Sequence, residues 1–285
     1  MDTWLTNDVK ELLFKPCLEA SGYIGNRLDN RLKMAQSIDE RALTEDFVDL
    51  FDSSSSISAW SKVSQLLRDH QIYLNTNVKK STVEHKTGAD IGLIIQRGIY
   101  QKNTKSKTRY AVLIQCKKID ENGHVNDFFH KVNSSGKTQS SLMLDITPNS
   151  FYFIFTPPSL IKTYHSIEPI AFASTSPGCS SPLWNMGCFG FESGTFPFLN
   201  SQQKAEVTGI LVIPALAVEA HENTSNKASL ENILSNSMPL WYWFGELLIP
   251  GFIGDNTKET LAVASNQQGI EFGVKYSIEI NYGNG

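Results

Sequence analysis

The chain has 285 residues, 41% of them hydrophobic and 19% charged, which is enough to bury a sizeable core as one large domain or two small ones. Its longest apolar runs, at 112–114 and 247–253, fall far short of the roughly 20 residues that cross a bilayer, so we expect no contact with a membrane. The N-terminal residues lack a basic segment followed by a long apolar stretch, and the four cysteines are scattered without zinc-ligand spacing. These features favour a cytoplasmic protein with reduced thiols and argue against a secretory signal.

The first half of the chain alternates between helical and extended patterns. Apolar residues recur with helical spacing from about residue 30 to 51 and again from about 57 to 69. Residues 71–83, 91–95 and 110–116 have the alternation or the β-branched apolar runs of strands. A short helix is predicted at 138–146, and an aromatic strand at 150–156 is stopped by two prolines. The order helix, helix, three strands, helix, strand predicts a mixed α/β or α+β layer.

Beyond about residue 160 the pattern is weaker. Residues 174–201 are dense in Ser, Pro and Gly with interspersed aromatics, which indicates a structured loop region because aromatic side chains favour burial. Strands are predicted at 207–216 and 270–281, with a short helix at 229–236. We therefore divide the chain into an N-terminal extension (1–30), a core (31–160) and a C-terminal region (161–285). The last region either extends the same sheet or forms a separate lobe, which could mediate oligomer or partner contacts.

Basic residues concentrate in one part of the chain. Between residues 79 and 118 there are ten lysines and arginines and two acids, a local charge of +8, which leaves −12 on the rest of a chain whose net charge is −4. Such asymmetry is typical of a polyanion-binding face on an acidic body, although a solvated hairpin tip gives the same count. The residues that we expect to contact nucleic acid are Lys86, Lys102, Lys105, Lys107, Arg109 and Lys118.

Polar residues interrupt two of the apolar strands. Side chains alternate faces along a strand, so Gln115 and Lys117 lie side by side on one face. A buried ammonium or amide without a partner is costly, and Asp90, at the start of the preceding strand, is the expected partner if the two strands form an antiparallel hairpin. An acid, an amide oxygen and a lysine then converge at the end of the hairpin that is farthest from its turn.

This trio suits a hard divalent cation such as Mg²⁺ or Mn²⁺, which prefers oxygen ligands and is held by one or two carboxylates together with substrate phosphate. Asp90 is the expected anchoring ligand, and the Gln115 carbonyl and the backbone carbonyl of Cys116 can supply further oxygens. Lys117 can position the attacking water or stabilise the charge that develops on phosphorus. The constellation predicts phosphodiester hydrolysis.

The sequence Gly-Ala-Asp-Ile-Gly at 88–92, followed by a hairpin and by Gln-Cys-Lys at 115–117, resembles the PD-(D/E)xK nuclease superfamily in its Asp…QxK variant. That variant is found in Mrr-like restriction endonucleases and in nuclease effectors of bacterial anti-phage systems. The resemblance covers about residues 31–156 and implies a restriction-endonuclease-like αβββαβ core, here with additional C-terminal strands. It also implies that a helix supplies an acidic residue to the site. Gln115 replaces the commoner glutamate, which reduces the negative charge of the site.

Two residues are candidates for the helix acid. At 100° per residue, with Leu43 as zero, Glu40 lies at about 60°, on the apolar stripe, whereas Glu45 lies at about 200°. The sheet-facing position favours Glu40, and Glu45 is the alternative. Glu84 and Gln139 could also line the site, although an exposed strand position and a surface helix position are the ordinary interpretations of these two residues.

Together these residues predict a Mg²⁺- or Mn²⁺-dependent endonuclease that hydrolyses DNA. The resemblance implies a role as the effector subunit of an anti-phage or restriction system, acting with a partner protein or as a homo-oligomer. The alternative is a noncatalytic module with a nuclease-like fold that binds nucleic acid or a partner protein through the basic hairpin. Nothing in the sequence distinguishes DNA from RNA.

Overall fold

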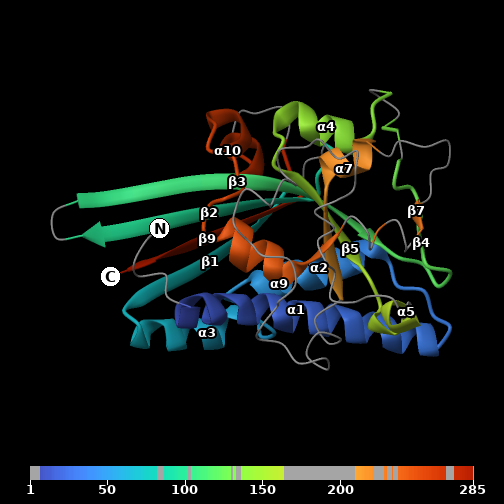
Figure 1. Ribbon diagram of the computed structural model, residues 1–285, viewed down its shortest axis with the longest axis horizontal. Coiled ribbons are helices and arrows are strands. Elements are labelled where there is room, and N and C mark those ends of the chain that lie inside the picture. The colour runs from blue at the N-terminus through green and yellow to red at the C-terminus, as the bar shows by residue number, and fades with distance from the viewer. Residues whose placement is uncertain are drawn as a thin grey trace.

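The computed structural model describes residues 7–81, 87–101, 104–129, 131–132, 136–163, 209–220, 228–229, 233, 237–267 and 273–284. Within these ranges the chain is a mixed α/β structure built on a seven-stranded sheet, which confirms the predicted fold class (Figure 1). The helices are α1 (Asn7–Lys33), α2 (Glu40–Phe51), α3 (Trp60–Asp69), α4 (Gln139–Ile146), α5 (Pro158–Thr163), α7 (Ala215–Ala220), α9 (Leu240–Tyr242), the π-helix η2 (Trp243–Leu248) and α10 (Lys258–Ala264). The strands are β1 (Ile72–Lys80), β2 (Ile91–Gln101), β3 (Thr104–Lys118), β4 (His124–Val125), β5 (Ser150–Phe155), β6 (Ile210–Pro214), β7 (Ala228–Ser229), β8 (Met238–Pro239) and β9 (Tyr276–Asn284).

The strand order of the main sheet is β1-β9-β2-β3-β5-β6-β8. β2 and β3 form the predicted antiparallel hairpin, and β3 pairs in parallel with β5. β9 lies between β1 and β2, antiparallel to the first and parallel to the second. β6 and β8 continue the sheet beyond β5. The C-terminal strands β6, β8 and β9 therefore extend the same sheet, which was one of the two arrangements that the sequence left open, whereas β7 pairs with β4 in a separate two-stranded sheet.

Helices cover both faces of the sheet. One core joins the sheet to α1, α2, α3, α9 and η2, and the other joins it to α4, α7 and α10. Figure 1 shows the two groups of helices on opposite sides of the strands. Consecutive residues of the central strands contribute to different cores: Val112 and Ile114 face the α2 side, whereas Leu113 faces the α4 side. This explains why β3 has a continuous apolar run in its sequence.

The helical pattern predicted at about 30–51 is divided between two helices. α1 ends at Lys33, and α2 begins at Glu40, where the side chain of Asp39 accepts a hydrogen bond from the backbone N–H of Arg41 at 3.1 Å. Such a cap satisfies one of the free N–H groups at a helix start and fixes where the helix begins. The cap places Glu40 in the first turn of α2. The loop predicted at 174–201 lies outside the described residues, as does most of the helix predicted at 229–236.

No helix among the described residues is long and apolar enough to span a membrane. Cys17 and Cys116 are buried free thiols, whereas Cys179 and Cys188 lie outside the described part of the chain.

Candidate active site at the end of the β2–β3 hairpin

β3 continues for four residues past the point where β2 begins. Ile91 is paired with Ile114, and the backbone N–H of Asp90 donates to the carbonyl of Ile114 at 2.9 Å. Beyond this pair, the edge of β3 that faced β2 no longer has a neighbouring strand. Its backbone donors need other partners, because a buried N–H without one is costly.

Two carboxylates supply those partners. Oδ2 of Asp90 accepts the N–H of Cys116 at 3.0 Å, and Oε2 of Glu40 accepts the N–H of Lys118 at 3.1 Å. These two amides are two residues apart on one edge of β3, which corresponds to about 7 Å. One acid thus comes from the turn before β2 and the other from the first turn of α2, and both lie along the same stretch of strand.

The side chain of Gln115 contacts the first of these carboxylates, Asp90, and Gln115 is 4% exposed. Its side-chain Nε2 donates to Oδ2 of Asp90 at 2.6 Å and to the carbonyl oxygen of Cys116 at 3.1 Å. The amide nitrogen therefore occupies a point where two oxygen atoms from different elements converge. The structure thus brings Gln115 to Asp90 as predicted, although the amide nitrogen, and not the predicted amide oxygen, faces the carboxylate.

Lys117 is 6% exposed, and its Nζ lies 3.8 Å from Oε1 of Glu40. Burying an ammonium is costly unless a charged partner accompanies it, and Glu40 is that partner. The neighbouring Lys118 is directed elsewhere, because its Nζ donates to the backbone carbonyl of Ile38. Lys118, which we expected to contact nucleic acid, is thus engaged within the protein.

Burial changes the proton affinity of both acids. The pKa of Asp90 is raised, chiefly because burial disfavours its charged form, and this effect exceeds the opposing effects of the Cys116 N–H and the ammonium groups of Lys117 and Lys275. The pKa of Glu40 is also raised by burial, against the lowering effect of Lys117, and the negative charge of Asp90 adds to the increase. The two carboxylates are therefore close enough to repel each other.

Glu45 is placed differently from Glu40. The Tyr276 hydroxyl donates to its Oε1 at 2.9 Å, and Arg41 lies 3.4 Å from the same oxygen. The pKa of Glu45 is lowered, primarily by the Tyr276 hydrogen bond. The structure thus brings Glu40, and not Glu45, to Lys117, as the helical periodicity predicted.

The N-terminus of α4 packs against the turn that precedes Asp90. Gly88 has a positive φ of 75°, and a Cβ there would lie 2.6 Å from the backbone oxygen of Gln139. The side-chain oxygen Oε1 of Gln139 is buried and has no hydrogen-bond partner among the described residues. Gln139 therefore lies near the Asp90 turn with a side-chain oxygen that no described residue satisfies, whereas Glu84, the other secondary candidate, lies outside the described residues.

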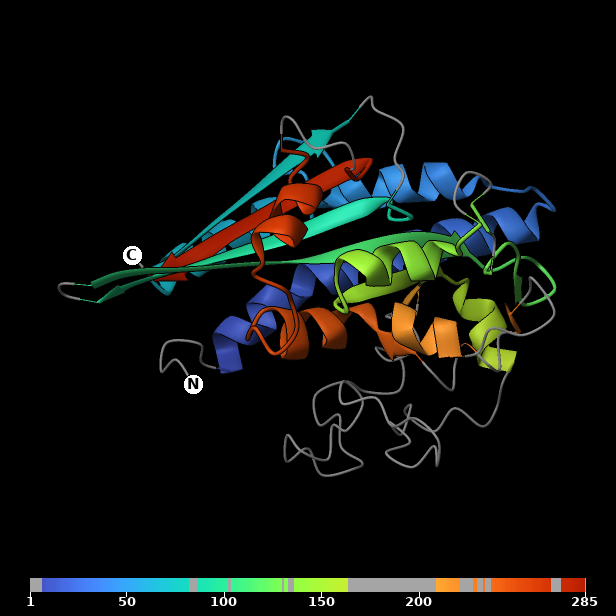
Figure 2. The ribbon, with the colours of Figure 1, turned by 90° about the horizontal axis from the view of Figure 1, so that it is seen from above.

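Most of the predicted nucleic-acid contacts lie far from this site or cannot be placed. Arg109 precedes Lys117 by eight residues, about 27 Å along β3, and Lys107 precedes it by ten, about 34 Å. Figure 2 shows this end of the hairpin projecting past the rest of the sheet. Arg109 also pairs with Glu279 at 3.3 Å. Lys86, Lys102 and the side chain of Lys105 lie outside the described part of the structure.

Sequence reasoning missed Lys275 and Tyr276, which come from the start of β9. The backbone N–H of Tyr276 donates to the carbonyl of Asp90 at 2.9 Å, and the ammonium of Lys275 lies 4.9 Å from the centre of the Tyr276 ring. The positive charge of Lys275 lowers the pKa of both Asp90 and Glu45, so it lies near both acids. No local pattern around residue 275 indicates that these residues lie beside the Asp90 turn.

The donor atoms at the site are hard oxygens. The carboxylates of Asp90 and Glu40, the side-chain oxygen of Gln115 and the backbone oxygen of Cys116 are the kind of ligands that Mg²⁺ prefers. Among the described residues there is no cluster of three or more His, Cys, Asp or Glu side chains that could hold a metal ion. The set contains no thiolate or imidazole and does not resemble a zinc site.

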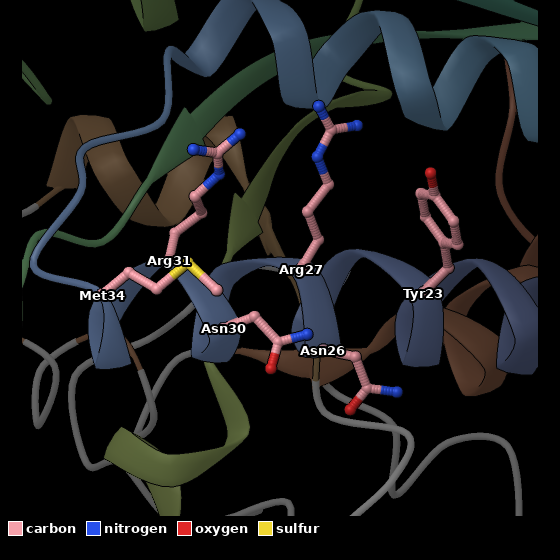
Figure 3. A pocket seen from close by; sticks show the side chains of 6 residues that line it. All are labelled: Tyr23, Asn26, Arg27, Asn30, Arg31 and Met34. Carbon is pink, nitrogen blue, oxygen red and sulfur yellow. The ribbon is translucent and has the colours of Figure 1, made fainter.

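Two surface depressions lie away from these residues. One, of about 510 Å³, is lined by the α1 residues Tyr23, Asn26, Arg27, Asn30, Arg31 and Met34, and Figure 3 shows the two arginines and Tyr23 on one side of α1 and the two asparagines on the other. Its arginines are engaged, Arg27 with Asp46 and Arg31 with Gln36. The other, of about 380 Å³, lies between the β2–β3 hairpin and residues 250–256. Neither includes the Asp90 cluster.

Comparison of the chain with protein-family models, with curated proteins and with solved structures gives no match.

Proposed function

We propose that the protein is a metal-dependent endonuclease that hydrolyses phosphodiester bonds in DNA. The observation that supports this most strongly is the convergence of Asp90, Gln115, Lys117 and Glu40 at the point where β3 continues past β2. Two carboxylates, an amide and a buried ammonium come from three separate elements of the chain. A strand end without a chemical role needs only one acceptor for each free N–H and has no need of a buried lysine.

The acids and the amide are the residues that would hold a divalent cation. Asp90, Gln115 and the Cys116 carbonyl are the first candidates, and Glu40 completes the set. A bound Mg²⁺ or Mn²⁺ would supply a Lewis acid that activates water and neutralises charge on the phosphate. Gln115 currently directs Nε2 toward the two oxygens, so its amide would have to turn by about 180° to present Oε1, because a cation and an N–H cannot share one acceptor position.

Lys117 would act on the phosphate. Its ammonium is nearly excluded from solvent, and charge–charge interactions are stronger where water is excluded. It would stabilise the negative charge that grows on the phosphoryl oxygens as water adds to phosphorus and the bond to the leaving oxygen breaks. Glu40 would hold Lys117 in place through the 3.8 Å contact. The biological setting that we propose is an anti-phage or restriction system in which a partner protein or a second copy controls the activity.

A noncatalytic nucleic-acid- or partner-binding module is the second candidate. It is favoured by the fact that both carboxylates already accept backbone hydrogen bonds from β3. In this case Asp90 and Glu40 would only terminate the strand.

Plasmid cleavage separates the two candidates. The purified protein should nick or linearise supercoiled DNA with Mg²⁺ or Mn²⁺ and not with EDTA. Asp90→Ala and Lys117→Ala should each lower the rate by at least about 100-fold, because each removes a group that acts on the reacting phosphate. Glu259→Ala and Lys258→Ala are matched controls, since both residues are exposed on α10. If the wild type binds DNA without cutting it under any of these conditions, alone or with neighbouring gene products, the binding module is the better account.

A further inference from the structure

Lys275 carries a positive charge that no carboxylate of the described structure pairs with. Its ammonium has a lowering effect on the pKa of both Asp90 and Glu45. No acidic oxygen among the described residues lies within ion-pair distance of it. It is partly buried and lies 4.9 Å from the centre of the Tyr276 ring, which favours a cation over its face. An ammonium that no described carboxylate pairs with, next to a proposed phosphate-cleaving site, is suited to bind an anion.

The strand register places Lys275 in a row that crosses the sheet. Ile114 of β3 is level with Ile91 of β2, which is level with Tyr276 of β9, which is level with Lys80 of β1. Neighbouring strands are about 4.8 Å apart, so the row from β3 to β1 spans roughly 14 Å. The Asp90 site lies at the β3–β2 end of this row, and Lys275 immediately precedes Tyr276, which is the β9 position of the row.

Lys80 extends the positive charge to β1. Its ammonium lies 5.8 Å from the centre of the same Tyr276 ring and 3.8 Å from Oδ1 of Asp49. Both side chains of this ion pair are about half exposed, and exposed pairs of this kind contribute little free energy. A phosphate can therefore compete with Asp49 for Lys80.

We infer that Lys275 binds a phosphate of the substrate next to the one held at Asp90, so that the nucleic-acid backbone crosses the ends of β3, β2, β9 and β1 toward Lys80. This inference rests on the proposed function, because it takes the Asp90 site as the position of the reacting phosphate. The row with Lys275 and Lys80 is closer to Lys117 than the projecting end of the hairpin, which is about 27–34 Å away. We therefore assign the substrate contacts near the site to this row and not to the hairpin end.

Binding of a labelled DNA duplex in EDTA tests the inference without any cleavage. Fluorescence anisotropy across a salt series gives the slope of log K against log salt, whose magnitude is about 0.9 for each phosphate that the protein neutralises. Lys275→Gln keeps most of the side-chain stem and removes the charge. It should lower the magnitude of the slope by about 0.9 and weaken binding about fivefold at 0.15 M salt. Lys275→Arg should keep the wild-type slope, and Lys80→Gln should lower it as Lys275→Gln does.

Lys258→Gln is the matched control, since this lysine is exposed on α10, and its slope should equal that of the wild type. A wild-type slope in Lys275→Gln, or a wild type that binds no duplex, overturns the inference. Because the assay contains no metal, its result is independent of catalysis. A protein that cuts plasmid but keeps its slope in Lys275→Gln retains the proposed function, and only the assignment of a phosphate to Lys275 is then wrong.

Discussion

Asp90 and Glu40 each have two properties with opposite effects on the stability of the fold. Each accepts a backbone N–H of β3 and so stabilises the strand end, but burial raises the pKa of each and makes its charge unfavourable. A protein that needed only a strand cap could use a neutral acceptor there. The preference for Glu40 over Glu45 could be predicted from the sequence because it depends on helical periodicity alone. The position of Lys275 beside Asp90 could not be predicted, because it depends on a strand pairing that no local pattern encodes.

Asp90→Asn should raise the free energy of unfolding at pH 7 in EDTA, or leave it unchanged. A raised pKa means that the folded chain binds more protons than the unfolded chain, so stability falls as pH rises from the unfolded-state pKa of about 4 to the folded-state value. Removing the carboxylate removes this loss. Thermal unfolding from pH 4 to pH 8 should therefore show the variant gaining on the wild type as pH rises.

Glu45→Gln should behave in the opposite way, because the Tyr276 hydroxyl lowers the pKa of Glu45. The stability that Glu45 contributes is present above about pH 4 and is lost as pH falls through its folded-state pKa.

Mg²⁺ or Mn²⁺ should raise the unfolding temperature of the wild type and not that of Asp90→Asn, because a cation that binds only the folded state stabilises it. A wild type that is more stable than Asp90→Asn in EDTA at pH 8 would contradict the role of burial.

At the scale of elements, the site depends on the contact between α4 and the turn before β2. The hairpin itself was predictable, since two apolar runs on either side of a polar turn favour antiparallel pairing, and this pairing brings Asp90 to Gln115. The contact between this turn and α4 could not be predicted, because it depends on the close approach of two backbones at Gly88. Only glycine combines the positive φ with this approach.

Gly88→Ala should destabilise the protein by more than Gly136→Ala. Both glycines have a positive φ, of 75° and 66°, so both variants bear the cost of about 1–2 kcal/mol for an L-residue in that conformation. A Cβ at Gly88 would also collide with the backbone of Gln139, whereas a Cβ at Gly136 meets nothing within 4 Å. Urea unfolding should show the difference, and cleavage should fall in Gly88→Ala alone. Equal destabilisation in the two variants would mean that α4 moves aside without resistance.

At the scale of the whole molecule, the N-terminal and C-terminal parts form one sheet. β9 separates β1 from β2, and β6 pairs with β5, so residues from both parts of the chain share the core that includes α1 and β9. The longer strands could be predicted from their apolar runs or alternation, whereas the two-residue strands β4, β7 and β8 could not. The order of the strands could not be predicted either, because a strand carries no local mark of which distant strand it will pair with.

A chain that stops before Tyr276 should lose cooperative unfolding, because it lacks a strand that is paired on both sides along its length. A chain that lacks only Gly285, which follows β9, should unfold like the 285-residue chain. Circular dichroism melts of the two chains measure this directly. An unchanged transition in the shorter chain would show that β1 and β2 do not depend on β9.

The position of β9 also orders events during synthesis. β1 is antiparallel to β9 and β9 is parallel to β2, so β1 and β2 run in opposite directions and are oriented to pair with each other directly. Roughly 200 residues separate β1 from β9, which corresponds to about 10–40 s of translation at 5–20 residues per second. For most of that interval the nascent chain contains Asp90, Gln115 and Lys117 but not Lys275. The full row across the sheet forms only when β9 is inserted between β1 and β2. A nascent chain on the ribosome therefore lacks part of the proposed nucleic-acid-binding surface.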